Sequence, residues 1–409
     1  MKRLWMMLLI AAVLVFAGSR SRAAEVAPPP GPRVITYKPQ DLVEVKNRIK
    51  AGSAVETKSL AVLVEEAEKA LVAKTFSVVN KPNTPPSGDK HDYMSLSPYW
   101  WPDPSKPDGL PYIRRDGETN HERDQYDQPV LDDFTTTTFT LALAYYYTGD
   151  EKYAEKATQL MRAWFFEPET RMNPNCRWAQ VVRGREDQVK ASGVLETDRF
   201  RRILDAEALM ADYKGWTSED HEKLKEWIRQ LHDYILTSPM GKEESIQKNN
   251  HGTWYAVQAA AYEMYLGDDD AAKKRIETEG KARIRSQIEP DGKQPFELER
   301  TKAFDYSRYN LAALMTLAGL GDRYDLNLWN YQTDDGRSIR KALDWLAPYA
   351  VGEQKWDRAQ IVNPKIEEMF TLFRRAAIQY HEPKYEELAE KVPQQDPQAN
   401  RTNLLFPKP

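Results

Sequence analysis

The sequence predicts an all-α fold, an incomplete (α/α) toroid of helical hairpins whose long loops line a cleft. The first observation is an alanine-rich segment ending in Gly-Asp that recurs at 141–150, 259–268 and 312–322, with a degraded copy at 376–385. Glycine suits the left-handed position that ends a helix and aspartate caps the next, so each copy predicts two helices joined by a tight turn. The second observation is that few segments alternate with period two, as strands would. Stacked hairpins form solenoids or toroids, and the uneven spacing of the copies favours a toroid.

The first residues have the pattern of a secretory signal peptide, which we place at 1–23. Lys2 and Arg3 provide a positive start, 4–17 is apolar, and 21–23 reads Ser-Arg-Ala, a small-x-small cleavage site. The apolar run is shorter than the roughly 20 residues that a membrane-spanning helix needs. We therefore expect a periplasmic or secreted protein with no stable membrane insertion after signal cleavage.

The mature chain is predicted to form one domain. A proline-rich linker at 24–39 precedes a single toroid over 40–390, and a C-terminal tail follows at 391–409. Within the domain, residues 77–130 show no clear period and are rich in Pro, Gly, Asp and Tyr. A loop of this length in a compact chain is functional or disordered, and the aromatic residues of this one argue against disorder.

The composition limits the possible partners. The 58 Lys and Arg residues nearly balance 62 Asp and Glu, giving a net charge of -4, whereas nucleic-acid binding usually requires a strong basic excess. With one cysteine, Cys176, no disulfide can form within the chain. No pair of its six histidines has the spacing of a metal motif such as HExxH. We therefore predict no nucleic-acid partner, no metal and no cofactor.

The segment KNNHGTWY at 248–255 is the first candidate site. It precedes a predicted helix at 256–266, so one asparagine can act as the N-cap. Capping does not account for the second asparagine, Asn250, together with His251 and Trp254 on the same turn. Because a helix N-terminus attracts anions, amide, imidazole and indole donors at this place suit a carboxylate. From the spacing alone, a structural and a functional role are equally supported.

The segment ELERTKAFDYSRYN at 297–310 is the second candidate site. Arg300 and Tyr306 lie less than two turns apart if the helix is continuous. Positive neighbours favour a phenolate, so we predict that the pKa of Tyr306 is lowered and that Tyr306 is a general base. Either residue could instead be an ordinary surface arginine or core tyrosine.

Two further loops provide candidate substrate contacts. The segment 170–185 gathers four arginines with amides and a tryptophan, and SPYWWPDP at 97–104 has two adjacent tryptophans that could stack on sugar rings or cover a cleft. With the neighbours of the first two segments, the predicted substrate-binding residues are Trp100, Trp101, Asn173, Asn175, Trp178, Gln180, Arg183, Trp254, Lys302, Arg308 and Tyr309.

Together these segments resemble the alginate lyase superfamily, whose members are α/α toroids that act on alginate and related polyuronates. The resemblance covers roughly residues 90–350. It rests on SPYWWPDP at 97–104, MNPN…Q at 172–180, NNHGTW at 249–254 and ELER…YSRYN at 297–310. Each motif alone is weak, but the set is fairly specific.

The resemblance implies that Asn250, His251, Arg300 and Tyr306 are the catalytic residues. The gap between the arginine and the tyrosine is one residue shorter than in the better-known alginate lyases. The chain therefore resembles a divergent branch that includes glucuronan lyases as well as alginate lyases. This difference bears on the substrate more than on the reaction.

The implied reaction is β-elimination at a β-1,4-linked uronate of polymannuronate, alginate or glucuronan. Removal of the C5 proton requires the adjacent carboxylate to be neutralised, and Asn250, His251 and Arg300 would do so as an oxyanion hole does. In mannuronate and glucuronate the C5 hydrogen and O4 share one ring face, so Tyr306 could take the proton and return it to O4. In guluronate they lie on opposite faces, and His251 would be the second group.

The predicted partner is thus an anionic polysaccharide. A chain of net charge -4 must concentrate its cations to bind one. We therefore expect Arg300, Lys302, Arg308 and the arginines of 171–185 to line a common basic cleft.

Two other functions remain open at this stage. A glycoside hydrolase on a similar toroid needs two carboxylates, about 5 Å or about 6.5–9.5 Å apart, and Asp132, Asp133, Glu297 and Glu299 are available. A non-catalytic periplasmic glycan-binding protein would need no base.

Overall fold

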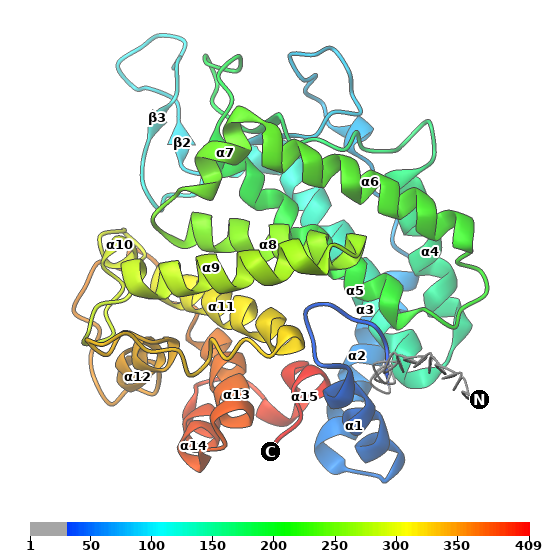
Figure 1. Cartoon of the computed structure of the whole chain (residues 1–409). Coiled ribbons are helices and arrows are strands. Elements are labelled where there is room, and N and C mark those ends of the chain that lie inside the picture. The colour runs from blue at the N-terminus through cyan, green and yellow to red at the C-terminus, as the bar shows by residue number, and fades with distance from the viewer. Residues whose placement is uncertain (1–30) are drawn as a thin grey trace, which may run out of the picture.

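The structure is a computed structural model that describes residues 31–409. The predicted signal peptide at 1–23 lies outside the described residues. Helices dominate (Figure 1). They are α1 (Pro39–Lys50), α2 (Ala54–Leu71), α3 (Asp127–Thr148), α4 (Glu151–Phe165), α5 (Arg201–Leu209), α6 (Ser218–Thr237), α7 (Pro239–Ser245), α8 (Asn250–Leu266), α9 (Asp269–Gln287), α10 (Pro295–Leu298), α11 (Ala303–Gly321), α12 (Ile339–Ala350), α13 (Met369–Tyr380), α14 (Pro383–Lys391) and α15 (Thr402–Leu405).

Gly-Asp turns join two of the hairpins as predicted. Helix α3 ends at Gly149, whose φ is 75°, and the Asp150 side chain caps α4. Helix α8 ends at Gly267, whose φ is 84°, and the Asp268 side chain caps α9. Glycine adopts this left-handed backbone without the steric cost that a Cβ would add.

The third predicted turn, at Gly321 and Asp322, is wrong. Gly321 keeps helical angles with φ -65°, and the chain continues into a short 3₁₀ turn. The Asp322 carboxylate does not cap a helix but pairs with the Lys38 ammonium at 3.0 Å. This aspartate therefore ties the end of α11 to the start of the fold.

The hairpins follow one another around a ring. Helix α3 packs on α2, α4 and α5; α8 packs on α5, α6, α9 and α11; and α11 packs on α12 and α13. The single-turn helix α15 contacts α1, α2 and α13, and it lies beside α1 near the C-terminus in Figure 1. It bridges the gap between the first and last hairpins, so the fold is the predicted incomplete (α/α) toroid.

The inner helices are buried on nearly all sides. In α8 the small residues Ala256, Ala259, Ala260 and Ala261 are fully buried, which lets neighbouring helices approach closely. A helix that is apolar all round belongs in the core. The N-terminal ends of α8 and α11 carry Asn250 and Tyr306, so two buried helices position the two candidate segments.

The loop at 77–130 is ordered, as its aromatic content predicts. Strand β1 (Met94–Leu96) pairs in parallel with β4 (Trp178–Val181). Strand β2 (Trp100–Trp101) pairs antiparallel with β3 (Ile113–Arg114), and this hairpin projects from one edge of the ring in Figure 1.

Residues beyond both predicted boundaries of the domain pack into the fold. In the expected linker at 24–39, Val34 and Ile35 are buried, and the Ile35 N–H donates to Asp205 at 2.6 Å. In the expected tail at 391–409, Leu404 is buried. None of the helices in residues 31–409 combines the length and apolar character needed to cross a bilayer.

Candidate active site

A cavity of about 560 Å³ opens where the 97–118 loop, the α7–α8 connection and the start of α11 meet. Four predicted catalytic residues line it: Asn250, His251, Arg300 and Tyr306. The structure thus brings together two segments that lie about fifty residues apart in the chain. Among residues 31–409, no group of three or more His, Cys, Asp and Glu side chains is arranged to hold a metal ion.

The two asparagines at the start of α8 have different roles. The Asn249 side chain is the N-cap and accepts the His251 N–H at 3.2 Å. Asn250 is the first residue of the helix and is 1% exposed. Its backbone N–H and its Nδ2 donate to the two oxygens of Glu297, at 2.6 Å and 2.8 Å. Capping therefore accounts for one asparagine, and the other is held by a buried carboxyl group.

The His251 imidazole is oriented by a second buried carboxylate. Its Nδ1 lies 2.6 Å from Oε1 of Glu244, and these side chains are 23% and 1% exposed. A carboxylate accepts a proton at Nδ1, so Nε2 is the nitrogen available to the cavity. The side chain of Glu244 thereby sets both the tautomer and the direction of the ring.

Arg300 and Tyr306 form a close pair. An Arg300 Nη2 N–H donates to the Tyr306 hydroxyl at 2.9 Å, and the guanidinium lies over the Tyr306 ring, 3.9 Å from its centroid. The Tyr306 hydroxyl in turn donates to the Tyr99 hydroxyl at 2.8 Å. Tyr99 comes from the 97–118 loop, so the loop supplies a third member of this group.

The expected lowering of the Tyr306 pKa is wrong. Burial raises the pKa of Tyr306, and the nearby Tyr99 hydroxyl raises it further. The Arg300 cation lowers the pKa, but less than burial raises it. Positive neighbours favour a phenolate only against the cost of desolvating it, and desolvation is the larger effect here.

Asp116, also from the 97–118 loop, fixes the Arg300 guanidinium. The Asp116 carboxylate accepts from Arg300 at 2.7 Å and 3.2 Å, and from the backbone N–H of Thr301 at 3.2 Å. Burial acts to raise the pKa of Asp116, but these hydrogen bonds outweigh it and hold the pKa well below its usual range. Asp116 is therefore an anion at neutral pH and anchors the arginine.

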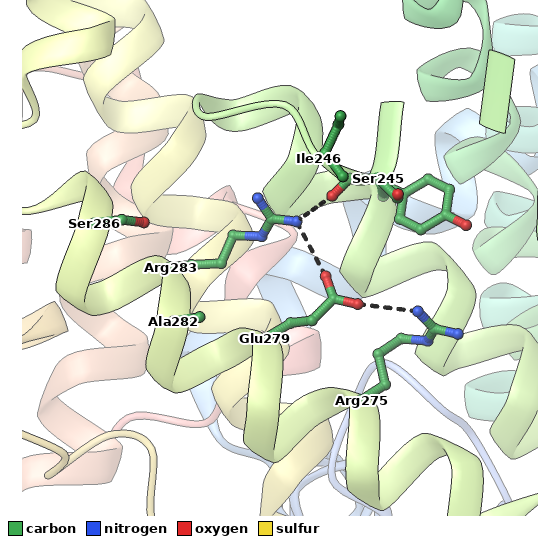
Figure 2. Close-up of a pocket in the computed structure, with 8 residues that line it drawn as sticks. Ser245, Ile246, Arg275, Glu279, Ala282, Arg283 and Ser286 are labelled. Carbon is green, nitrogen blue, oxygen red and sulfur yellow. Dashed lines mark hydrogen bonds and ion pairs between the residues drawn. The ribbon is translucent and has the colours of Figure 1, made fainter. Parts of the chain in front are cut away.

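The connection between α7 and α8 follows Glu244 and is held in place by hydrogen bonds from α9. Figure 2 shows this region, a hollow of about 430 Å³ between the end of α7 and α9. Arg283 of α9 donates to the carbonyl oxygens of Ser245 at 2.7 Å and Gln247 at 2.8 Å, and pairs with Glu279 at 3.0 Å. These bonds hold the connection against the start of α8.

Gly252 permits this close packing. A Cβ at this position would lie 2.2 Å from the Gln247 carbonyl oxygen and 2.3 Å from Nη1 of Arg283. We expect Gly252→Ala to lower the stability of the protein by about 1–3 kcal/mol, because the bracing contacts must move apart. Denaturant unfolding measures the change. Gly319→Ala in α11 is the control, since its Cβ meets only an arginine end at 3.4 Å; equal destabilisation of both variants would contradict this reading.

Three of the predicted substrate-binding residues line the cavity. Trp100 lies under the Lys190 ammonium, which is 3.9 Å from the ring centroid. The Gln180 side chain accepts from Ser192 at 2.7 Å. Tyr309 lies on α11, one turn beyond Tyr306.

The two tryptophans Trp178 and Trp254 are buried, and neither lines the cavity. Trp178 is 6% exposed and forms part of β4, where the parallel pairing with β1 packs it in a small core. Trp254 is 7% exposed and packs against Tyr309, with ring centroids 5.1 Å apart. The prediction of sugar contacts for these two side chains is therefore corrected.

Asn173, Asn175 and Trp101 are also not among the residues that line the cavity. Both asparagines donate to the Asp92 carboxylate, at 2.9 Å and 3.0 Å, and so tie two loops together. The Trp101 indole donates to the Glu118 carbonyl at 2.9 Å inside the 97–118 loop. Loop packing therefore explains these two asparagines of the 170–185 segment, whereas its glutamine, Gln180, lines the cavity.

The expected basic cleft has different members. Arg183, Lys302 and Arg308 do not line the cavity. Arg183 pairs with Glu122 at 2.7 Å, and the buried Arg308, which is 6% exposed, pairs with Glu368. The Lys302 ammonium lies over the Tyr99 ring, 5.3 Å from its centroid. The cations that do line it are Arg114, Arg123, Lys190, Arg199 and Arg300. Only Arg300 was predicted.

A family model described as alginate lyase matches residues 77–356, a range that contains every side chain lining the cavity. The protein is therefore a polysaccharide lyase. More particularly, the chain belongs to the alginate lyase family. A search of curated protein sequences returned no match.

Solved structures agree with this assignment. An alginate lyase from Bacteroides ovatus is 39% identical, with 92% of this chain and 99% of that chain covered and a TM-score of 0.88. Alginate lyase A1-III from Sphingomonas species A1 is 17% identical, with 87% and 95% covered and a TM-score of 0.53. A histidine-to-alanine variant of A1-III complexed with a tetrasaccharide is 16% identical, with 87% and 94% covered and a TM-score of 0.55. The two A1-III structures share the fold.

Proposed function

We propose that this lyase cleaves a β-1,4-linked polyuronate, polymannuronate or glucuronan, by β-elimination with Tyr306 as base and then acid. The observation that carries the proposal is the position of the Tyr306 hydroxyl, which lies in the cavity between Arg300 at 2.9 Å and Tyr99 at 2.8 Å. The similarity to the Bacteroides ovatus alginate lyase supports a uronate polymer as substrate.

Each step of the elimination has a residue to perform it. Arg300, His251 and Asn250 bind the uronate carboxylate and stabilise the charge that develops on it. The Tyr306 hydroxyl is protonated at neutral pH because burial raises its pKa, so it must first release its proton to solvent. The resulting phenolate takes the C5 proton, and the electrons of the C5–H bond form the C4–C5 double bond. The C4–O4 bond breaks, and the leaving O4 takes its electron pair and the proton that Tyr306 has gained.

Among the described residues 31–409, the acidic side chains near the cavity other than Glu243 are bound by neighbouring groups, which favours elimination over hydrolysis. Glu297 binds Asn250, and Glu244 binds His251. The buried Glu196 accepts hydroxyl protons from Tyr93 at 2.7 Å and Ser95 at 2.6 Å. Asp132 pairs with Arg199. A glycosidase needs one carboxyl group free to donate a proton and another free to act as base or nucleophile.

A substrate panel tests the proposed function. Polymannuronate, polyguluronate, glucuronan and hyaluronan are offered separately, and the formation of an unsaturated uronate is followed by its near-ultraviolet absorbance. We expect turnover of polymannuronate or glucuronan to exceed that of polyguluronate, because only the first two place the C5 proton and O4 on one face. Absence of turnover on every polymer would contradict the proposal.

Lys190 is expected to contribute to substrate binding. Burial and, to a lesser extent, the neighbouring cations Arg114 and Arg185 lower the pKa of Lys190 to about 8. A uronate carboxylate would favour the charged form. We expect Lys190→Met to raise KM about tenfold, equivalent to the loss of one charged hydrogen bond, with kcat nearly unchanged. Exposed Lys248→Met is the control; a fall in kcat alone would contradict a binding role.

We also propose that the chain is exported, on the basis of the signal-peptide pattern at 1–23. Fractionation of cells that produce the protein tests this proposal. The mature protein is expected in the periplasm or the medium, with its N-terminus after Ala23. Retention of the full-length chain in the cytoplasm would contradict it.

A further inference from the structure

We propose that Glu297 sets the orientation of the Asn250 amide by gaining a proton, and that only the protonated carboxyl group turns the amide N–H groups toward a substrate carboxylate. The inference rests on the proposed function, since it concerns how Asn250 recognises a uronate. It assigns Glu297 as a positioning residue that acts through Asn250.

The hydrogen-bonded contact between Asn250 and Glu297 is buried, and all but one of the polar atoms named below have a partner. Both residues are 1% exposed. Glu297 Oε1 accepts the Asn250 backbone N–H at 2.6 Å, and Oε2 accepts Nδ2 at 2.8 Å. Within residues 31–409, the remaining polar atom of the amide, Oδ1, is buried with no hydrogen-bond partner. Buried polar atoms are almost always paired, so this one calls for an explanation.

The orientation seen here is the one that an ionised Glu297 requires. A carboxylate only accepts, so it turns Nδ2 toward itself and leaves Oδ1 as the atom available elsewhere. An amide oxygen repels a substrate carboxylate. In this state Asn250 therefore opposes the binding that the proposed function requires of it.

A protonated Glu297 reverses the amide without moving the backbone. Oε1 still accepts the Asn250 backbone N–H, and the proton on Oε2 is donated to Oδ1 after a half turn of the amide. Oδ1 then has its partner, and the two N–H groups of Nδ2 are free for a carboxylate. One proton thus satisfies the orphaned oxygen and converts Asn250 from an acceptor to a donor.

The electrostatic surroundings make this proton available near neutral pH. Burial raises the pKa of Glu297 to about 7, against the hydrogen bonds from Asn250 and the charges of Arg300 and His251, which lower it. Glu244 lies behind His251 on α7 and partly offsets its charge. From α11, Tyr306 adds a neutral phenol bound to Arg300. A substrate carboxylate would bring a further negative charge, so we expect binding to favour the protonated form.

Proton uptake on binding tests the inference. Tyr306→Phe, which is expected to bind without turnover, is titrated calorimetrically with mannuronate and glucuronate tetrasaccharides at pH 8. Repeating the titration in buffers of different ionisation enthalpy gives the number of protons taken up, of which we expect Glu297 to contribute about one per site. In Tyr306→Phe/Glu297→Gln the uptake should fall by about this amount, because glutamine mimics the protonated carboxyl group and does not titrate, whereas any uptake by Lys190 is common to both variants.

Controls separate the possible results. Tyr306→Phe/Glu299→Gln changes an exposed carboxylate two residues away and should keep the uptake. Binding without uptake, or the same uptake after Glu297→Gln, would overturn the inference while leaving the proposed function intact. Absence of binding to either tetrasaccharide would remove both. Unfolding midpoints of each variant establish that the fold is retained.

The pH dependence of binding gives a second readout. In Tyr306→Phe, the association constant for a tetrasaccharide is expected to fall as pH rises past the Glu297 pKa, because the ionised form presents the amide oxygen. The further change Glu297→Gln should reduce this fall while keeping the affinity at pH 6 within about tenfold. A purely structural role for Glu297 predicts instead a profile of unchanged shape.

Discussion

Replacement of Tyr306 by phenylalanine is expected to lower kcat at least about 1,000-fold while Kd for an oligouronate changes little. The hydroxyl is the only group removed, and it is the one proposed to carry the C5 proton to O4; general acid–base groups contribute about 100- to 10,000-fold. The ring remains under the Arg300 guanidinium at 3.9 Å, so the cavity keeps its shape. Turnover is measured by product absorbance and binding by calorimetry.

Tyr324→Phe is the matched control for this substitution. Its hydroxyl donates to the Asp269 carboxylate at 2.6 Å, away from the cavity, so the variant loses a hydrogen-bonded tyrosine hydroxyl without touching the site. Its kcat should equal that of the wild type. Substantial turnover by Tyr306→Phe would transfer the role of base to another residue, and the non-catalytic binding hypothesis predicts no difference between the variants.

Replacement of Arg300 by alanine is expected to lower kcat/KM about 100-fold, the cost of losing one transition-state donor. A second effect distinguishes this residue from a simple substrate anchor. Arg300 lowers the pKa of Tyr306, so its removal raises that pKa, and the phenolate forms only at higher pH. The rising limb of the kcat/KM profile should therefore move to higher pH.

Arg285→Ala, an exposed arginine on α9, should leave both the rate and the profile unchanged. Arg300→Lys keeps the charge but not the two-sided contact with Asp116 and Tyr306, so it should recover only part of the rate. A rate loss in Arg300→Ala with an unshifted profile would mean that Arg300 binds substrate without activating Tyr306.

The fold was predictable because its signals are local. Gly149-Asp150 and Gly267-Asp268 each end one helix and cap the next within two residues, and no distant contact is needed to recognise them. The different roles of Asn249 and Asn250 were also predictable locally, because a helix start needs only one N-cap residue and the second asparagine then requires another explanation. Asp322 shows the limit of such signals, because its partner Lys38 lies at the start of α1, far away in the sequence, and only the folded chain brings the two together.

The candidate site was predictable only where its residues are adjacent in the chain. Tyr99 meets Tyr306 across 207 positions, and Asp116 meets Arg300 across 184. No local pattern indicates such contacts. The direction of the Tyr306 pKa shift depends on burial of the hydroxyl. Burial cannot be predicted from the charged residues that are close to Tyr306 in the sequence. Trp178 was wrongly predicted to contact sugar because the residue with which it pairs, Met94 of the parallel strand β1, is distant in the sequence.

The most direct test of the central claim is the ratio of unsaturated ends to new reducing ends during cleavage of polymannuronate or glucuronan. β-Elimination creates one C4–C5 double bond for every chain cut, so near-ultraviolet absorbance and reducing ends should rise in equal amounts, and both should vanish in Tyr306→Phe. New reducing ends without absorbance would show hydrolysis and contradict the account of this site.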